Sequence, residues 1–317
     1  MALQHLTLDQ IDEAQLQRLI DGKASETRDI EYKRDRYGDA DKDYAEYLAD
    51  ISSFANITGG DIIIGMTAEE GVPTGFAPLQ IDPDAEILRL DNIARSGFQP
   101  RIFGLDIRGY QIAMGGFALV VRIPRSYNQP HRTVRNGTGH HRFYARSSAG
   151  KYEPNVDELR AMFTRAPQLA ERMSDFRLER IAHIAAGNTP VRLLDEGCFV
   201  LHVVPFSTFD LRPPFSLQQA LTLWHNFSPI GATATTKRIN FDGFLTLSNS
   251  DPNTIEHRNY VQVFRTGAIE AVASLFVRGQ DPIKTRLMPS RLNGRQWIVP
   301  VFTRPCCTIA EPIRRWR

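Results

Sequence analysis

The stretch of sequence that decides the fold runs from Glu26 to Glu70. It opens with E-T-R-D-I-E-Y-K (Glu26–Lys33) and closes with F-A-N-I-T-G-G-D-I-I-I-G-M-T-A-E-E (Phe54–Glu70). The pattern predicts a short charged strand, a helix, a glycine turn and a buried strand that ends in acidic residues. Several carboxylates are therefore expected near one end of a small sheet, where a metal or a basic partner could meet them.

The elements around this stretch follow from periodicity and from capping residues. Apolar residues at helical spacing predict helices, and alternating or continuous apolar runs predict strands. The helices expected in the first half are Thr7–Ile20, Asp41–Ala55, Asp84–Ser96 and Val156–Phe163. The strands expected there are Arg28–Lys33, Asp61–Met66, Phe117–Ile123 and Arg142–Arg146.

The length of 317 residues favours two domains. We expect the first over residues 1–165, with Ala166-Pro167 beginning a linker, and a second α+β domain of unknown role over residues 166–317. The second half should contain a helix near Asp175–Ala185 and several strands. Those strands are Cys198–Pro205, Gly243–Ser248 and Tyr260–Arg265, the last followed by a hairpin turn at Thr266-Gly267.

Composition limits the class of protein. The chain is 42% hydrophobic and 23% charged, with a formal net charge of +2, so any electrostatic case for nucleic acid must rest on local clusters. The three cysteines show no C-x-x-C spacing, which argues against a disulfide framework or a cysteine zinc site. The N-terminus does not resemble a signal peptide and no apolar run is long enough to span a membrane. We expect a cytoplasmic protein.

Glu26, Glu31 and Lys33 form the first candidate site. Carboxylates are the ligands that Mg²⁺ or Mn²⁺ prefers, and a metal ion held by clustered carboxylates can keep a face open to phosphate. Glu31 and Lys33 share one face of the expected strand, whereas Glu26 lies five residues from Glu31 and must reach in from the loop after Gly22. The alternative is a solvated ion pair on an edge strand.

The second candidate site is a basic segment between Arg125 and Lys151 that contains no acidic residue. Basic side chains bind phosphates, and interleaved aromatic residues can stack on unpaired bases. The candidate nucleic-acid-binding residues are Arg125, Arg132, Arg135, Arg142, Tyr144, Arg146 and Lys151. A solvated loop beside a core strand is the alternative, and His131, His140 and His141 add a general acid or a metal ligand as further interpretations.

Other features favour structural interpretations. The I-T-G-G-D sequence could cradle a phosphate with backbone N–H groups, but a helix-to-strand turn explains the glycines better. Asn56 is expected to cap the preceding helix. His202, His225 and His257 are expected to be structural, and Arg265 with Glu270 a surface pair.

Several motifs, in order, resemble the Schlafen AlbA-2 domain over about 150 residues. The motifs are E-T-R-D-I-E-Y-K, F-A-N-I-T-G-G-D-I-I-I-G, V-P-T-G-F (Val72–Phe76), V-V-R-I-P-R-S (Val120–Ser126) and F-Y-A-R-S-S-A-G-K (Phe143–Lys151). The resemblance implies an α+β fold with a mixed sheet and packed helices.

The resemblance also implies two kinds of function. Bacterial members are described as DNA-binding transcriptional regulators or ATP-binding proteins, whereas similar animal domains are endoribonucleases that act on transfer and ribosomal RNA through three acidic residues. Glu26 and Glu31 match the family's E-x4-E-x-K pattern, and Glu69 is the nearest third acid, with Glu70 and Asp61 as substitutes.

We therefore expect a nucleic-acid-binding protein. The more specific hypothesis is a metal-dependent endoribonuclease that acts on structured RNA such as tRNA, in stress or phage defence. In this hypothesis Glu26, Glu31 and Glu69 are the catalytic metal ligands, and Lys33 holds the phosphate. A homodimer could complete the RNA cradle. The alternative is a non-catalytic regulator that binds DNA, or a protein that binds ATP.

Overall fold

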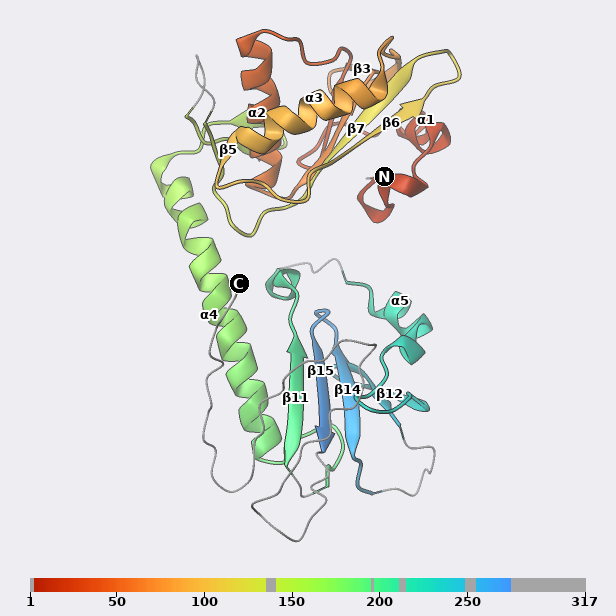
Figure 1. Ribbon diagram of the computed structural model, residues 1–317, viewed down its shortest axis with the longest axis vertical. Helices are drawn as coiled ribbons and strands as arrows, with labels where there is room; N and C mark the ends of the chain where they lie inside the picture. The colour runs from red at the N-terminus through yellow and green to blue at the C-terminus, as the bar shows by residue number, and fades with distance from the viewer. Residues whose placement is uncertain (1–2, 135–140, 195–196, 211–214, 249–254, 275–317) are drawn as a thin grey trace. The chain divides into compact units, whose positions relative to one another are not determined.

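In the computed structural model the chain divides into two units, residues 1–168 and 169–317 (Figure 1). The structure describes residues 3–134, 141–194, 197–210, 215–248 and 255–274. Within these ranges no helix has the length and apolar character needed to cross a membrane. Both units combine helices with sheets, so the predicted α+β class is confirmed.

A mixed four-stranded sheet in the order β1-β2-β7-β6 organises the first unit. Its strands are β1 (Ile30–Lys33), β2 (Gly60–Ile64), β6 (Asp106–Gln111) and β7 (Phe117–Ile123). β1 runs parallel to β2, and the other two pairings are antiparallel. β1 is therefore an edge strand of the sheet.

Helices cover both faces of this sheet. α2 (Asp41–Ala55) and α3 (Pro83–Ser96) bury one face, in a core that includes Ile62 and Ile64 of β2 (Figure 1). The other face packs against the N-terminal turns η1 (Leu3–His5) and η2 (Leu8–Gln10) and the helix α1 (Glu13–Asp21). β2 and β7 are buried on both faces, as their continuous apolar sequences predict.

The first predicted helix begins later than expected. Thr7 caps only the short turn η2, and Asp12 caps α1 by accepting a hydrogen bond from the Gln15 N–H (3.1 Å). By contrast, α2 and β7 have the predicted bounds. The agreement follows from their long uninterrupted apolar patterns.

Three two-stranded ribbons complete the first unit. They are β3 (Met66–Glu69) with β4 (Val72–Phe76), β5 (Phe98–Gln99) with β8 (Arg132–Thr133), and β9 (Ala145–Ser147) with β10 (Gly150–Tyr152). The last ribbon and β8 both belong to the basic segment, and both contact α2.

One helix, α4 (Val156–Ala185), replaces the predicted pair of helices and the linker between them. It passes through Ala166 and Pro167 without a break. Proline usually ends a helix because it lacks an N–H and clashes with the preceding turn. In this sequence the strong helix formers on both sides outweigh that local signal.

The second unit is built on a five-stranded antiparallel sheet in the order β11-β15-β14-β13-β12. Its strands are β11 (Cys198–Val203), β12 (Thr236–Asn240), β13 (Gly243–Leu247), β14 (Asn259–Phe264) and β15 (Ile269–Ser274). β14 and β15 form the predicted hairpin. Ile184 of α4 belongs to the core on one face, and α5 (Leu217–Thr222) contributes to the core on the other.

Glu270 is fully buried, so the predicted surface pair with Arg265 is wrong. Arg180 donates two hydrogen bonds to its carboxylate (2.8 and 2.9 Å), Tyr260 donates one (2.8 Å), and His202 Nε2 lies 3.0 Å away. Burial raises the pKa of Glu270, but the contacts with His202 and Arg180 outweigh it and lower the pKa from 4.5 to about 2. The buried ion pair between Arg180 and Glu270 therefore links α4 to strand β15 of the sheet.

Replacing Glu270 tests this link. Because the folded pKa lies below the ordinary value, Glu270 stabilises the unit above about pH 4.5, and this contribution disappears as the pH falls toward 2. Glu270→Gln should cost about 3 kcal/mol at pH 7 and flatten the loss of stability below pH 4.5. Trp224 packs against the core of this unit, so tryptophan fluorescence in urea reports on its unfolding.

Glu256→Gln is the matched control, because Glu256 pairs with Arg192 at the surface. Its cost should stay below about 1 kcal/mol. Equal costs for the two variants would contradict the buried link.

Candidate nucleic-acid interface

Strand β1 places Glu31 and Lys33 on the sheet face that α2 covers. Ile30 and Tyr32 belong to the core on the opposite face, and side chains alternate along a strand. Lys33 Nζ lies 2.9 Å from Glu31 Oε1, and the two side chains are only 22% and 12% exposed. The predicted alternation is confirmed, but the pair is not a solvated surface pair.

Helix α2 adds two carboxylates one turn apart, Glu46 and Asp50. Asp50 lies on the inner face of the helix and is fully buried, whereas Glu46 is half exposed. Lys33 Nζ contacts both, at 2.8 Å from Glu46 Oε1 and 3.2 Å from Asp50 Oδ2. The Tyr37 hydroxyl also donates to Asp50 Oδ2 (2.8 Å). Lys33 therefore lies among three carboxylates.

The β9–β10 hairpin adds two cations, Arg146 and Lys151, which are cross-strand partners. Arg146 Nη1 lies 2.5 Å from Glu31 Oε2, and its guanidinium carbon lies 4.2 Å from the centre of the Phe54 ring. Lys151 Nζ donates to Asp50 Oδ1 (2.6 Å). The hairpin thus docks on α2 and β1 through charge pairs.

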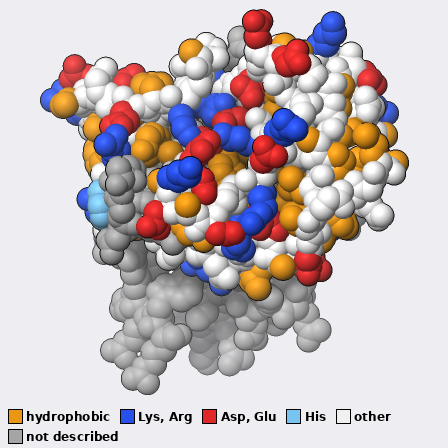
Figure 2. Space-filling view, turned by 90° about the horizontal axis from the view of Figure 1, so that it is seen from above, with side chains coloured by type: hydrophobic (Ala, Val, Ile, Leu, Met, Phe, Trp, Pro, Cys, Tyr) orange, Lys and Arg blue, Asp and Glu red, His pale blue; other side chains and the backbone are white. Residues whose placement is uncertain are grey.

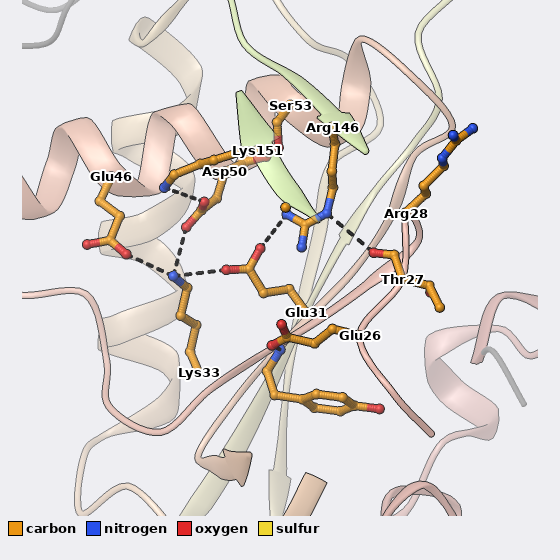
Figure 3. A network of polar contacts seen from close by, with 12 residues as sticks. Glu26, Thr27, Arg28, Glu31, Lys33, Glu46, Asp50, Ser53, Arg146 and Lys151 are labelled. Atoms are coloured by element: carbon orange, nitrogen blue, oxygen red, sulfur yellow. Dashed lines mark hydrogen bonds and ion pairs between the residues drawn. The ribbon is translucent and has the colours of Figure 1, made fainter. Parts of the chain in front are cut away.

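Figure 3 shows these side chains as one network drawn from β1, α2 and the hairpin. The network contains three carboxylates and three cations, so its formal charge is zero: Glu31, Glu46, Asp50, Lys33, Arg146 and Lys151. Lys, Arg, Asp and Glu side chains also interleave across the face of the molecule in Figure 2.

The environment of Lys33 keeps its ammonium charged. Burial lowers the pKa of Lys33, but the carboxylates of Asp50 and Glu31 outweigh burial and hold the pKa above its ordinary value of 10.5. A group with so high a pKa is a poor general base near neutral pH. Lys33 is therefore suited to hold an anion as a fixed positive charge.

Glu26 lies at the outer edge of β1. Its Oε1 accepts a hydrogen bond from the Tyr32 N–H (3.1 Å), and its own N–H donates to the Gly71 carbonyl (2.7 Å), in the turn after Glu69. Glu69 is exposed at the end of β3. Figure 3 shows the Glu26 carboxylate apart from the contacts that Glu31 makes with Lys33 and Arg146.

The carboxylates expected to hold Mg²⁺ or Mn²⁺ do not share a coordination site in this arrangement. Both oxygens of Glu31 contact cations of the protein, Lys33 and Arg146. Asp61, the substitute third ligand, is buried and forms two hydrogen bonds with Arg122 (2.8 and 3.1 Å). Among the described residues no group of three or more His, Cys, Asp or Glu side chains could hold a metal ion. A divalent cation at Glu31 would have to displace Lys33 or Arg146.

The remaining basic residues occupy different settings. Arg142 is exposed and pairs with Glu153, and Arg132 donates to the Gln99 side chain (2.8 Å). Arg125 lies over the Tyr127 ring, 5.2 Å from its centre. Burial and the nearby Glu153 raise the pKa of Tyr144, which is only partly exposed. Arg135 and His140 lie outside the described residues.

His131 is buried and structural. Its Nδ1 lies 2.7 Å from the Pro100 carbonyl and its Nε2 lies 2.6 Å from Ser126 Oγ. Burial lowers the pKa of the imidazole, so the neutral form is favoured at pH 7. These contacts favour a packing role over that of a general acid.

Asn56 joins the end of α2 to two segments of the basic region. Its side-chain amide accepts from the His131 N–H (2.7 Å) and donates to the carbonyls of His131 (3.3 Å) and Tyr144 (2.8 Å). Asn56 also occupies the predicted C-cap position. It therefore holds the residues just before β9 and helps to position Arg146.

Gly59 and Gly60 are explained by close packing. A Cβ on Gly59 would lie 2.5 Å from the Arg125 nitrogen, and one on Gly60 would lie 2.5 Å from the Phe54 ring. Gly59 also has a φ of 73°. These contacts favour the predicted turn over a phosphate cradle.

Sequence reasoning missed Glu46 and Asp50. The available signal was an aspartate within the apolar stripe of α2, between Tyr47 and Phe54, where a charge is buried only if it is paired. The same reasoning predicts that buried Asp50 has cationic partners, but it does not say which ones.

Replacing Asn56 tests how the hairpin is held. Asn56→Ala leaves the His131 N–H and the Tyr144 carbonyl without their buried partner, at a cost of about 2–3 kcal/mol. Hydrogen exchange followed by mass spectrometry should show faster exchange in residues 143–152. Ser53→Ala is the control, because the buried Ser53 hydroxyl bonds only within α2, to the Asp50 carbonyl. Unchanged exchange in the Asn56 variant would contradict the anchoring role.

Two solved structures are among those similar to this chain. One is the DIP2311 protein from Corynebacterium diphtheriae, at 13% identity and a TM-score of 0.32; the match covers 49% of this chain and 32% of that protein. The other is the N-terminal domain of a protein related to the ATP-dependent DNA helicase RecG, from Nitrosomonas europaea. It has 21% identity and a TM-score of 0.32, and covers 44% of this chain and 90% of that domain. No curated protein matches the chain.

The match to a protein family falls on the segments that build the interface. The family model described as "Schlafen, AlbA_2" matches residues 26–155. This range begins at Glu26, includes β1 and α2, and ends just after the β9–β10 hairpin. The family suggests a nucleic-acid-related function. The match covers less than half of the chain, and residues 26–155 are similar to a Schlafen AlbA_2 domain.

Proposed function

We propose that the first unit binds nucleic acid at the surface where β1, α2 and the β9–β10 hairpin meet. The observation that carries the proposal is the convergence of Lys33, Arg146 and Lys151, from segments over 100 residues apart, at one polar network. Phosphate oxygens can take the place of the half-exposed carboxylate of Glu46 beside Lys33. RNA and DNA share this chemistry.

Side chains beside the network extend the surface. Tyr152 at the end of β10 is 37% exposed, and its hydroxyl donates a hydrogen bond to Glu158 (2.9 Å). An exposed aromatic ring can stack on an unpaired base. Arg142 adds a further exposed cation on the same segment. These features favour a strand with accessible bases.

Charge-matched variants test the proposal. Lys151→Met should weaken binding of a fluorescein-labelled RNA hairpin by about fivefold, the equivalent of about 1 kcal/mol. The slope of log K against log salt should fall by about 0.7–0.9, because one phosphate contact is lost. Arg108→Met removes one charge from β6, at the opposite edge of the sheet, and should leave the affinity nearly unchanged. The affinities of both variants are measured by fluorescence anisotropy.

Equal losses of affinity in the two variants would indicate only an effect of net charge. A wild-type protein that binds neither RNA nor DNA would refute the proposal.

Cleavage of structured RNA, such as tRNA, is the second candidate function. It is favoured by Glu26, Glu31 and Lys33, which match the family pattern and lie on or beside one edge strand. Mg²⁺ or Mn²⁺ would supply the positive charge that this chemistry needs, and binding there requires Glu31 to leave Lys33 or Arg146. A role in stress or phage defence belongs to this candidate.

Incubation with labelled tRNA distinguishes cleavage from binding. We expect product with Mg²⁺ or Mn²⁺, none with EDTA, and none from the Glu26→Ala/Glu31→Ala double variant, which should still bind RNA. Single-stranded DNA is tested in parallel. Binding without cleavage in every metal would rule out the nuclease and leave a DNA-binding regulator, whereas a preference for ATP over both nucleic acids would indicate a nucleotide-binding protein.

A further inference from the structure

We propose that Asp50 is a positioning residue of the nucleic-acid interface, which orients the ammonium groups of Lys33 and Lys151 toward a phosphate. The inference rests on the proposed function of this surface and deepens it. Asp50 lies outside the Glu26–Lys33 motif and outside the basic segment, and it acts from within α2.

The burial of Asp50 needs an explanation. Its side chain has no exposed surface, although its place in the inner stripe of α2 would suit an apolar residue. A buried ion pair is often no more stabilising than well-packed apolar side chains, but removing one partner is costly. Stability alone therefore gives little reason for a carboxylate at this position.

The contacts of Asp50 show what it can do. Lys151 binds Oδ1 (2.6 Å) and Lys33 approaches Oδ2 (3.2 Å), so one carboxylate holds two lysines that come from different strands. The Tyr37 hydroxyl donates to Oδ2 (2.8 Å) and fixes the carboxylate from below the surface. Asp50 can therefore set the positions of both ammonium groups at once.

The lysines need such support. A lysine side chain has a flexible four-carbon stem, and fixing it costs up to about 2 kcal/mol of rotamer entropy. The side chains of Lys33 and Lys151 are 22% and 32% exposed, so both reach the boundary between protein and solvent. Holding them there before binding reduces the cost of ordering them on a phosphate.

Glu46 provides the contrast. It contacts Lys33 from the same helix, one turn away, but it is half exposed. An exposed carboxylate beside a phosphate site repels the nucleic acid and adds little order, because solvent screens the pair. Removing the charge of Glu46 should strengthen binding, whereas removing that of Asp50 should weaken it.

Asp50→Asn and Glu46→Gln make the same charge change, so comparing them separates positioning from electrostatics. We expect Asp50→Asn to weaken RNA hairpin binding by about tenfold, although it removes a negative charge. The salt slope should fall by about 0.7–1.8, because one or two phosphate contacts are lost. Glu46→Gln should bind about two- to threefold more tightly.

Two further variants show whether Asp50 acts through the lysines. We compare the change in log Kd that Asp50→Asn causes in two proteins, the wild type and the Lys151→Met variant. The change in the Lys151→Met variant should be less than half of the change in the wild type. Tyr110→Phe removes a buried hydrogen bond to the Leu8 carbonyl on the other face of the sheet. It should lower stability without lowering affinity, which shows that a modest loss of stability does not weaken binding.

The outcomes separate the inference from the proposed function. Wild-type protein that binds neither RNA nor DNA would overturn both. If the wild type binds and the Asp50→Asn variant binds equally well or more tightly, only the positioning role is overturned. The same holds if the changes in log Kd caused by Asp50→Asn and Lys151→Met are fully additive in the double variant.

Discussion

A carboxylate buried on the inner face of α2 needs cationic partners, and much of the interface depends on this requirement. Asp50 is satisfied by Lys33 from β1, Lys151 from β10 and the Tyr37 hydroxyl. Because an unpaired buried charge is strongly unfavourable, these contacts hold the β9–β10 hairpin against α2. The pairing of Lys151 with Asp50 is thus one of the contacts that set the position of the hairpin.

A second set of contacts, made by Arg146, also holds the hairpin in place. Arg146 binds Glu31 and lies over the Phe54 ring, so the hairpin also contacts β1 and α2 through a cation with two kinds of partner. The network as a whole is neutral, and its cations are already bound to carboxylates. A phosphate that enters must therefore compete with carboxylates of the protein. Glu46 is the most exposed of the three carboxylates, so it is the one that we expect a phosphate at the proposed interface to displace.

The sequence predicted the elements whose apolar patterns are long and unbroken. α2 and β7 have the expected bounds, and the alternation along β1 placed Glu31 and Lys33 on one face. It did not predict that this face is covered. That result depends on α2 and on a hairpin more than 100 residues away along the chain, and periodicity within β1 carries no information about either.

Other differences have the same origin. Glu270 follows a turn that is typical of the surface, yet its partners His202 and Arg180 lie 68 and 90 residues away. Pro167 marks a local helix end that the flanking sequence overrides. The aspartate within the α2 stripe was visible in the sequence, but its partners became identifiable only once the strands and the hairpin were in place. Local patterns thus predicted the elements, and long-range contacts decided which charges meet.

The most direct test of this account is nitrogen-15 NMR of the lysine ammonium groups, recorded with and without a short RNA hairpin. Lys33 and Lys151 should give slowly exchanging signals in the free protein, because Asp50 holds both, and these signals should shift on addition of RNA. Lys23, which is exposed in the loop before β1, serves as the internal reference. Shifts confined to other lysines, with Lys33 and Lys151 unchanged at saturating RNA, would contradict the account.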